Sequence, residues 1–309
     1  LACSPVRSRD NSLMLSTRLR KQGRDIGGAL FAAPAMLVYL VFVGYPIAHT
    51  LGLSLFKWNG ISPEMIFVGL ANYKELFLED EVFRLALWNN LQWILITLLI
   101  PMLVGLTLAA LLSNAHRGDQ LWSALFFVPV VVPPVAAGIA WDLIYHPRVG
   151  LLNSILRALG LEKFSMAWLG NAEVALYACI QVGNWIFYGF CMLVFMNALK
   201  LIDRNLYEAA EIDGANGAQV FFRITIPLLR NSITFVTVYS VIAAFKAFEI
   251  VFVLTGGGPY HRTELVSTYM YSMMFNGLRI GYSAAIAAVL ALMAIVSAVL
   301  IIVIREHRE

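Results

Sequence analysis

Four polar and aromatic side chains recur within one apolar stretch of the sequence. A helix would place them on one face, and they are Gln181, Asn184, Trp185 and Tyr188. An aromatic ring can cover the apolar face of a sugar while amide groups bond its hydroxyls. The pattern is therefore compatible with a sugar site, but hydrogen bonding and packing between membrane helices use the same residue types. Packing is the more common use of such residues.

Two opposite charges stand three residues apart in a second apolar stretch. Lys246 and Glu249 would share one face of a continuous helix, close enough to pair. Ionisable groups are costly in a membrane span and normally face a protein interior or a wet cavity. They would therefore either line a transport pathway or form an ion pair that fixes helix packing. We favour the ion pair, because a matched pair neutralises itself.

The sequence carries no recognisable catalytic or metal-binding pattern. It lacks the G-x-x-x-x-G-K loop that cradles nucleotide phosphates. The stretch Thr255–Pro259 is rich in glycine, but no lysine follows it, so it predicts a turn. The five histidines show no metal spacing, and no Ser/His/Asp constellation is present. We therefore expect a non-enzymatic chain without a metal site, which cannot hydrolyse ATP by itself.

The polar segment between residues 201 and 231 predicts a helical hairpin. Asp203 or Asn205 can cap a first helix, and Glu208 suits the positive end of its dipole. Gly214 can take the left-handed conformation that stops the helix. A second short helix is expected over Ala218–Ile224.

Pro227 then suits the first turn of the next helix. Ala209 and Ala210 leave a smooth surface that another protein can approach closely. Two interpretations remain open for this hairpin. It is either a surface that docks against a partner or an ordinary amphipathic linker.

These residues belong to a chain with a membrane composition. Of its 309 residues, 60% are hydrophobic and 13% are charged, against about 25% charged residues in ordinary soluble proteins. Each of six apolar stretches reaches the ~20 residues that a helix needs to cross a bilayer. They lie at about 27–56, 85–112, 121–144, 174–199, 232–254 and 282–304. The sequence therefore predicts an all-α integral membrane protein with six transmembrane helices and a kink or break at Pro129–Pro134.

The distribution of basic residues predicts the orientation. Six spans put both termini on one side, together with 113–120 and 200–231. The segments on that side hold thirteen of the 22 Lys and Arg residues, whereas 57–84, 145–173 and 255–281 hold eight. The positive-inside rule then makes both termini cytoplasmic and puts the hairpin on the cytoplasmic side, between helices 4 and 5.

Three regions follow from this topology. They are a cytoplasmic N-terminal segment (1–26), a transmembrane domain (27–304, with the hairpin loop at 201–231) and a cytoplasmic tail (305–309). We expect no cleavable signal at the N-terminus, and Met14 is a possible natural start. The amphipathic stretch Leu151–Leu161 predicts a short interfacial helix ended by Gly160. Cys179 and Cys191 are expected to be small buried hydrophobes.

The hairpin resembles a known motif. Glu208-Ala209-Ala210, Asp213-Gly214-Ala215, Phe221 and Pro227 are similar to the EAA motif of permease subunits in binding-protein-dependent ABC importers. One departure is Asn231, where a second proline is common.

Further segments resemble the sugar-importing branch with its MalF-like and UgpA-like permeases. They include Phe67–Leu70, Gly150–Asn153 and Thr255–Pro259, and also Asn89-Asn90, which stands where Asn-Thr is usual.

This resemblance implies a permease subunit that forms half of a sugar pathway in the bacterial inner membrane. The residues that it assigns to ATPase coupling are Glu208, Ala209, Ala210, Asp213, Gly214, Ala215, Phe221 and Pro227. The implied partners are a second permease subunit, two ABC ATPase subunits and an extracytoplasmic solute-binding protein, with lipid around the spans and no nucleic acid. ATP and Mg would be used by the ATPase, and no cofactor is expected on this chain. Glycerol phosphate as substrate and a self-sufficient secondary carrier or channel are the alternatives. An integral-membrane enzyme would need a catalytic cluster, which the sequence lacks.

Overall fold

The computed structural model describes residues 31–113 and 119–306, which are mostly helical. These residues divide into two units at Leu53, and each unit is described by itself. The described part of the first unit is one apolar helical stretch, Phe31–Leu53, long enough to cross a membrane. It contains a π-helical turn, η1 (Leu40–Gly44), followed by α2 (Tyr45–Leu53). The expected N-terminal segment, its possible start at Met14, and residues 27–30 lie outside the described residues.

The second unit contains four further single helices or helix pairs of membrane-spanning length. They are α4 (Glu81–Ser113), α8 (Ala175–Lys200), α12 (Arg230–Phe245) with α13 (Glu249–Leu254), and α15 (Ile280–Glu306). A second helix pair, α5 (Asp119–Val131) and α6 (Pro134–Tyr145), reaches this length only when it is counted as one bent span. The described residues therefore contain five helices or helix pairs that are long and apolar enough to cross a membrane, or six with the bent pair. The prediction of a mostly helical chain with several membrane-spanning helices is confirmed.

The break between α5 and α6 is where the prolines predicted it. The two helices meet at an angle of 95°. Pro133 has an extended backbone, because the residue before another proline is kept out of the helical region. Pro134 then occupies the first turn of α6, where its missing N–H costs nothing.

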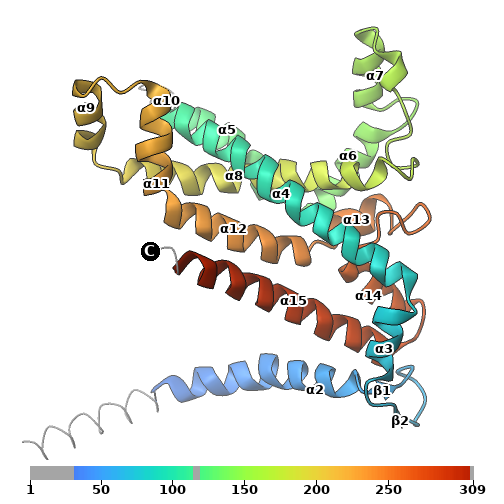
Figure 1. Cartoon of the computed structure of the whole chain (residues 1–309). Coiled ribbons are helices and arrows are strands. Elements are labelled where there is room, and N and C mark those ends of the chain that lie inside the picture. Colours follow the sequence, from blue (N-terminus) through green and yellow to red (C-terminus); the bar gives the residue numbers. More distant parts are fainter. Residues whose placement is uncertain (1–30, 114–118, 307–309) are drawn as a thin grey trace, which may run out of the picture. The chain divides into compact units, whose positions relative to one another are not determined.

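The centre of the second unit is the contact between α4 and α8, which lie side by side (Figure 1). Leu106, Ala109 and Phe195 are buried between them. Gly105 sits at the closest approach, because a Cβ there would lie 2.6 Å from the Cβ of Cys191. Small residues at such crossings let membrane helices pack backbone to backbone. Cys191 and Cys179 are both buried and free, as predicted.

The shorter elements lie at the two ends of the second unit (Figure 1). At one end are α9 (Arg204–Ile212), α10 (Gly217–Val220), the π-turn η3 (Phe221–Thr225) and α11 (Ile226–Leu228). At the other end are β1 (Phe56–Lys57), β2 (Ile66–Phe67) and α3 (Ala71–Leu78). The remaining elements are α7 (Leu151–Ala158), η2 (Glu162–Phe164) and α14 (Val266–Phe275).

Two of these elements bear on the predictions. β1 and β2 form a small antiparallel sheet, so the strictly all-α expectation needs this correction. The amide of Asn72 on α3 donates to the carbonyls of Ser54 and Phe56 and so ties the start of β1 to α3. The helix expected over Leu151–Leu161 is α7, and Gly160 follows it with a left-handed backbone at φ +71°.

Candidate functional site

The hairpin that the sequence predicts at residues 201–231 is present. Asp203 caps α9, and its carboxylate accepts a hydrogen bond from the backbone N–H of Asn205 at 3.0 Å. Gly214 follows the helix at φ +76°, a conformation that L-residues with a Cβ rarely adopt. Both local signals for the first helix are therefore confirmed.

The second arm of the hairpin begins with a capping box that sequence analysis missed. The side chain of Asn216 accepts from the N–H of Gln219, and the Gln219 side chain accepts from the N–H of Asn216, both at 2.9 Å. A capping residue followed three positions later by Gln is a known signal for a helix start. The arm then runs through α10, η3 and α11, and Pro227 lies in the first turn of α11, as predicted.

A hydrogen bond between side chains joins the two arms of the hairpin. The hydroxyls of Tyr207 on α9 and Thr225 on η3 lie 3.3 Å apart, and Thr225 is buried. Nothing in the local pattern links these residues, which are eighteen positions apart. A polar cavity of about 590 Å³ lies beside this contact, and Lys200, Glu208 and Glu211 are among its lining residues. The arms are thus held in one geometry while a polar cavity remains next to them.

The residues of the EAA motif lie along this hairpin with different exposures. Ala210 is buried, and Ala215 and Phe221 are partly buried. The others are exposed: Glu208, Ala209, Asp213, Gly214 and Pro227. Glu208 forms an ion pair with Arg204 at 3.3 Å, on the preceding turn of α9. The surface also carries large apolar side chains, among them Ile212, which is 86% exposed, and Phe222, which is 69% exposed.

The fifth apolar stretch is interrupted where Lys246 and Glu249 lie. α12 ends at Phe245 and α13 begins at Glu249, so the two charges stand on opposite sides of a break. The expectation that they share the face of a continuous helix is therefore wrong. No ion pair between them is seen in the described part of the chain. Instead, both line a cavity of about 170 Å³ together with Trp93 and Phe187.

The polar residues of α8 lie in different surroundings. Asn184 is 2% exposed, and its Oδ1 accepts from the Thr97 hydroxyl of α4 at 3.2 Å. Within the described residues its Nδ2 has no hydrogen-bond partner. Trp185 is partly buried with its ring centroid 5.7 Å from that of Trp141. Gln181 is exposed and Tyr188 is partly exposed. These four side chains therefore differ in burial and contacts, and none of them lines the cavity beside Lys246 and Glu249.

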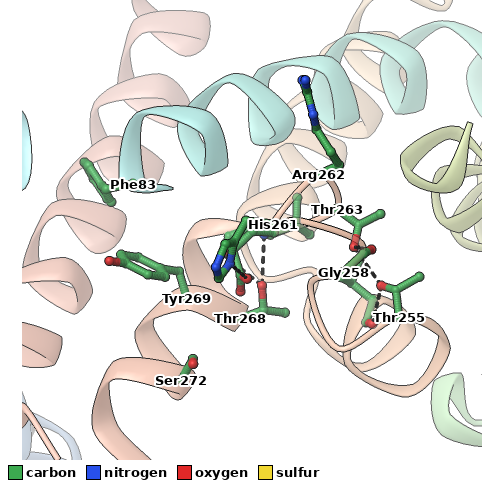
Figure 2. A network of polar contacts seen from close by, with 12 residues as sticks. Phe83, Thr255, Gly258, His261, Arg262, Thr263, Thr268, Tyr269 and Ser272 are labelled. Carbon is green, nitrogen blue, oxygen red and sulfur yellow. Dashed lines mark hydrogen bonds and ion pairs between the residues drawn. The ribbon is translucent and has the colours of Figure 1, made fainter. Parts of the chain in front are cut away.

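The glycine-rich stretch forms the predicted turn, in the loop between α13 and α14. Figure 2 shows Thr255 and Thr263 beside Gly258, and His261 next to Thr268. The Thr263 hydroxyl donates to the Gly258 carbonyl at 2.7 Å and lies 2.7 Å from the Thr255 hydroxyl. The buried carboxylate of Glu264 lies 3.0 Å from Nδ1 of His261. The loop is thus a closed network of polar contacts.

A second polar cluster joins α3 and the start of α4 to α14 and α15. Asp80 accepts hydrogen bonds from the hydroxyls of Tyr269, at 2.6 Å, and Tyr282. Burial, and then the hydrogen bond to Asp80, raises the pKa of Tyr269 above its usual value near 10, so its hydroxyl stays a donor. Arg279 donates two hydrogen bonds to the carboxylate of Glu75, at 2.7 and 2.8 Å.

Comparison with known proteins agrees with this arrangement. The family model for the binding-protein-dependent transport system inner membrane component matches residues 101–307. The probable ABC transporter permease protein YurN of Bacillus subtilis is 39% identical over 262 residues, which are 84% of this chain and 89% of YurN. The diacetylchitobiose uptake system permease protein NgcF of Streptomyces coelicolor is 32% identical over 89% of this chain and 81% of NgcF.

A solved structure shares the fold. It is a chain of a bacterial ABC transporter involved in the import of the acidic polysaccharide alginate. It has a TM-score of 0.80 and 23% identity, over 94% of this chain and 99% of that chain. The resemblance predicted from the EAA motif is confirmed. The chain belongs to the family of inner membrane components of binding-protein-dependent transport systems, which are non-catalytic permease subunits of ABC importers.

Proposed function

We propose that this chain forms half of the translocation pathway for a sugar or sugar-like solute and receives its energy through the hairpin at 201–231. The observation that carries the proposal is the exposed, braced surface of that hairpin. The solute class is supported by NgcF, whose name gives diacetylchitobiose as the solute of its uptake system.

The hairpin has the properties of a docking surface. Ile212 and Phe222 expose large apolar side chains, and Glu208 and Asp213 expose carboxylates. An apolar centre with a polar rim is typical of protein interfaces. The Tyr207–Thr225 hydrogen bond and the caps of α9 and α10 fix the hairpin, so it can transmit a push from an ATPase subunit instead of bending under it. The residues that we assign to coupling are Glu208, Ala209, Ala210, Asp213, Gly214, Ala215, Phe221 and Pro227.

The pathway belongs at the break in the fifth span. Broken membrane helices expose backbone groups, and in transporters they commonly form solute sites near the middle of the bilayer. The cavity lined by Lys246 and Glu249 supports these two residues as pathway residues. Gln181 and Tyr188 are retained as pathway residues because they are accessible. The contacts of Asn184 and Trp185 favour a role in helix packing.

The complex and its orientation complete the proposal. The chain would pair with a second permease subunit, two ABC ATPase subunits and an extracytoplasmic solute-binding protein. It would cross the bacterial inner membrane six times, with the bent α5–α6 pair as one span and both termini in the cytoplasm. ATP and Mg would act on the ATPase subunits, and this chain would bind no cofactor.

Glycerol phosphate is a second candidate solute, because Lys246 offers a cation beside the cavity. Replacement of Lys246 by Met separates the two candidates. Uptake of a phosphate ester requires the charge, whereas uptake of a neutral sugar keeps most of its rate.

Gly214→Asp tests the coupling role. We expect uptake by the complete importer to fall at least tenfold, while the amount of assembled permease in the membrane is unchanged. Gly160→Asp is a matched control, because Gly160 has a similar backbone at φ +71° and neither glycine has an atom within 4 Å of its missing Cβ. Both variants carry the same backbone strain, so normal uptake by Gly214→Asp, or an equal loss in both, would contradict coupling through the hairpin.

Charge reversal at Glu208 tests the same role independently. Glu208→Lys puts two positive charges side by side on α9, and we expect it to uncouple ATP hydrolysis from uptake. The double variant Arg204→Glu with Glu208→Lys restores the ion pair in reverse. If it also restores uptake, Glu208 acts by stabilising α9; if uptake stays low, Glu208 contacts the ATPase.

A further inference from the structure

The break in the fifth span leaves backbone carbonyls that need partners. It lies sixteen residues into an apolar stretch of 25 residues, Arg230–Leu254. Away from water, an unpaired carbonyl is costly, so a broken membrane helix persists only where other groups bond its freed backbone. In a continuous helix, the carbonyls of Ala244 and Ala247 would accept from N–H groups four residues later. At the break, both accept hydrogen bonds from side chains of other helices, and the carbonyl of Ala244 also accepts from the N–H of Ala247 at 3.3 Å.

Asn90 of α4 bonds the carbonyl that precedes the break. Its Nδ2 donates to the carbonyl of Ala244 at 3.2 Å, and its Oδ1 accepts from the N–H of Val266 at 2.8 Å. Asn90 is 1% exposed, so water does not compete for these bonds. One amide thus adds a second donor to the carbonyl at the end of α12 and satisfies an otherwise unpaired donor in the first turn of α14.

Ser267 of α14 bonds the carbonyl within the break. Its hydroxyl donates to the carbonyl of Ala247 in a short hydrogen bond, and the side chain is 5% exposed. Ser267 follows Val266, the residue that Asn90 holds. The two contacts therefore act together on the backbone to either side of Lys246.

We propose that Asn90 and Ser267 are positioning residues that keep the fifth span broken, so that Lys246 and Glu249 stay at the cavity. Asn90 and the N–H of Ala247 together engage the carbonyl of Ala244, which the N–H of Phe248 would need for α12 to continue. Without the two side chains, the helix can extend across Lys246–Phe248 and turn the charged side chains away from the cavity. The expected effect on uptake rests on the proposed pathway at the break. The expected effect on the backbone geometry of the break does not depend on that pathway.

Hydroxyl removal at Ser267 isolates one of the two contacts. We expect Ser267→Ala to lower the maximum uptake rate of the assembled importer about fivefold, the effect of one buried hydrogen bond. Ser267→Thr keeps a hydroxyl and is expected to restore the rate. Ser240→Ala is the matched control, because Ser240 is equally buried but bonds Val236 within its own helix. Equal rates for Ser267→Ala and Ser240→Ala would refute the effect of this contact on uptake, and a distance across the break then decides the positioning role.

Asn90 has a matched neighbour in the sequence. Asn89 is 2% exposed and its amide donates to the carbonyls of Arg262 and Glu264, so it makes two buried hydrogen bonds without touching the fifth span. We expect Asn90→Leu to alter the break and Asn89→Leu to leave it intact, although both remove two hydrogen bonds and an amide of the same size.

A distance across the break reports the geometry without relying on uptake. Spin labels at Phe235 on α12 and Phe252 on α13, both exposed, span it in the full importer. We expect Asn90→Leu and Ser267→Ala to shift the distance distribution, and Asn89→Leu and Ser240→Ala to match the unsubstituted chain. Unchanged distributions in the first two variants would overturn the proposal, whatever happens to uptake. A shifted distance with normal uptake would uphold the positioning role and refute the pathway at the break.

Discussion

At the residue scale, the Thr97–Asn184 hydrogen bond is a buried polar contact between α4 and α8. Thr97→Val leaves Oδ1 of the buried Asn184 without its donor, which we expect to lower the free energy of unfolding by about 1–3 kcal/mol. The loss is measurable by denaturant titration of the purified chain in detergent micelles. Thr107→Val is the control, because Thr107 is exposed and bonds only Leu103 in its own helix.

A double variant separates this contact from general packing. Thr97→Val with Asn184→Leu removes both polar partners at once, so its cost should be smaller than the sum of the single costs. Strict additivity would mean that the hydrogen bond contributes nothing to stability.

The site residues differ in how far the sequence could predict them. Asp203 and Gly214 act on neighbouring backbone, so their roles are visible in the local pattern. The Asn216–Gln219 capping box was equally visible and was missed. Lys246 and Glu249 were misjudged because their spacing implies a shared face only if the helix is continuous. Thr97 and Asn184 are 87 residues apart, and no local pattern could have joined them.

At the element scale, the crossing of α4 and α8 depends on a missing side chain. A Cβ at Gly105 would meet the Cβ of Cys191 at 2.6 Å and the backbone N of Met192 at 2.7 Å. We expect Gly105→Ala to separate the two helices and to lower the unfolding free energy by about 1–3 kcal/mol. Gly52→Ala is the control, since nothing lies within 4 Å of its missing Cβ. If both variants have the same unfolding free energy as the unsubstituted chain, the close crossing does not contribute to stability.

The two helix breaks show why one element could be predicted and another could not. The break between α5 and α6 follows from prolines at 129, 133 and 134, which act on their own backbone. The break between α12 and α13 contains neither proline nor glycine. It depends on Asn90 and Ser267, which come from distant parts of the chain. A break caused by tertiary contacts leaves no signal in the apolar pattern of its own segment.

At the scale of the whole molecule, one helix connects the two proposed sites. The hairpin arm passes through α11 directly into α12, and α12 ends at the break beside the cavity. A displacement of the hairpin by an ATPase would therefore reach Lys246 along a single rigid element. This arrangement requires the hairpin and the loop between α13 and α14 to lie on opposite sides of the membrane.

That requirement can be tested by labelling single cysteines. Three exposed positions serve as reporters: Ile61 is 77% exposed, Ile212 is 86% exposed and Tyr260 is 88% exposed. Cys179 and Cys191 are buried and should stay silent, and Cys3 would be replaced by serine. In right-side-out vesicles, a membrane-impermeant thiol reagent should label Ile61→Cys and Tyr260→Cys, and should reach Ile212→Cys only after permeabilisation. Labelling of Ile212→Cys alone would mean that the chain has the opposite orientation to the one predicted from the basic residues. Labelling of only one of Ile61→Cys and Tyr260→Cys would mean that the bent α5–α6 pair does not cross the membrane as one span, because the number of crossings between the two positions would then be odd.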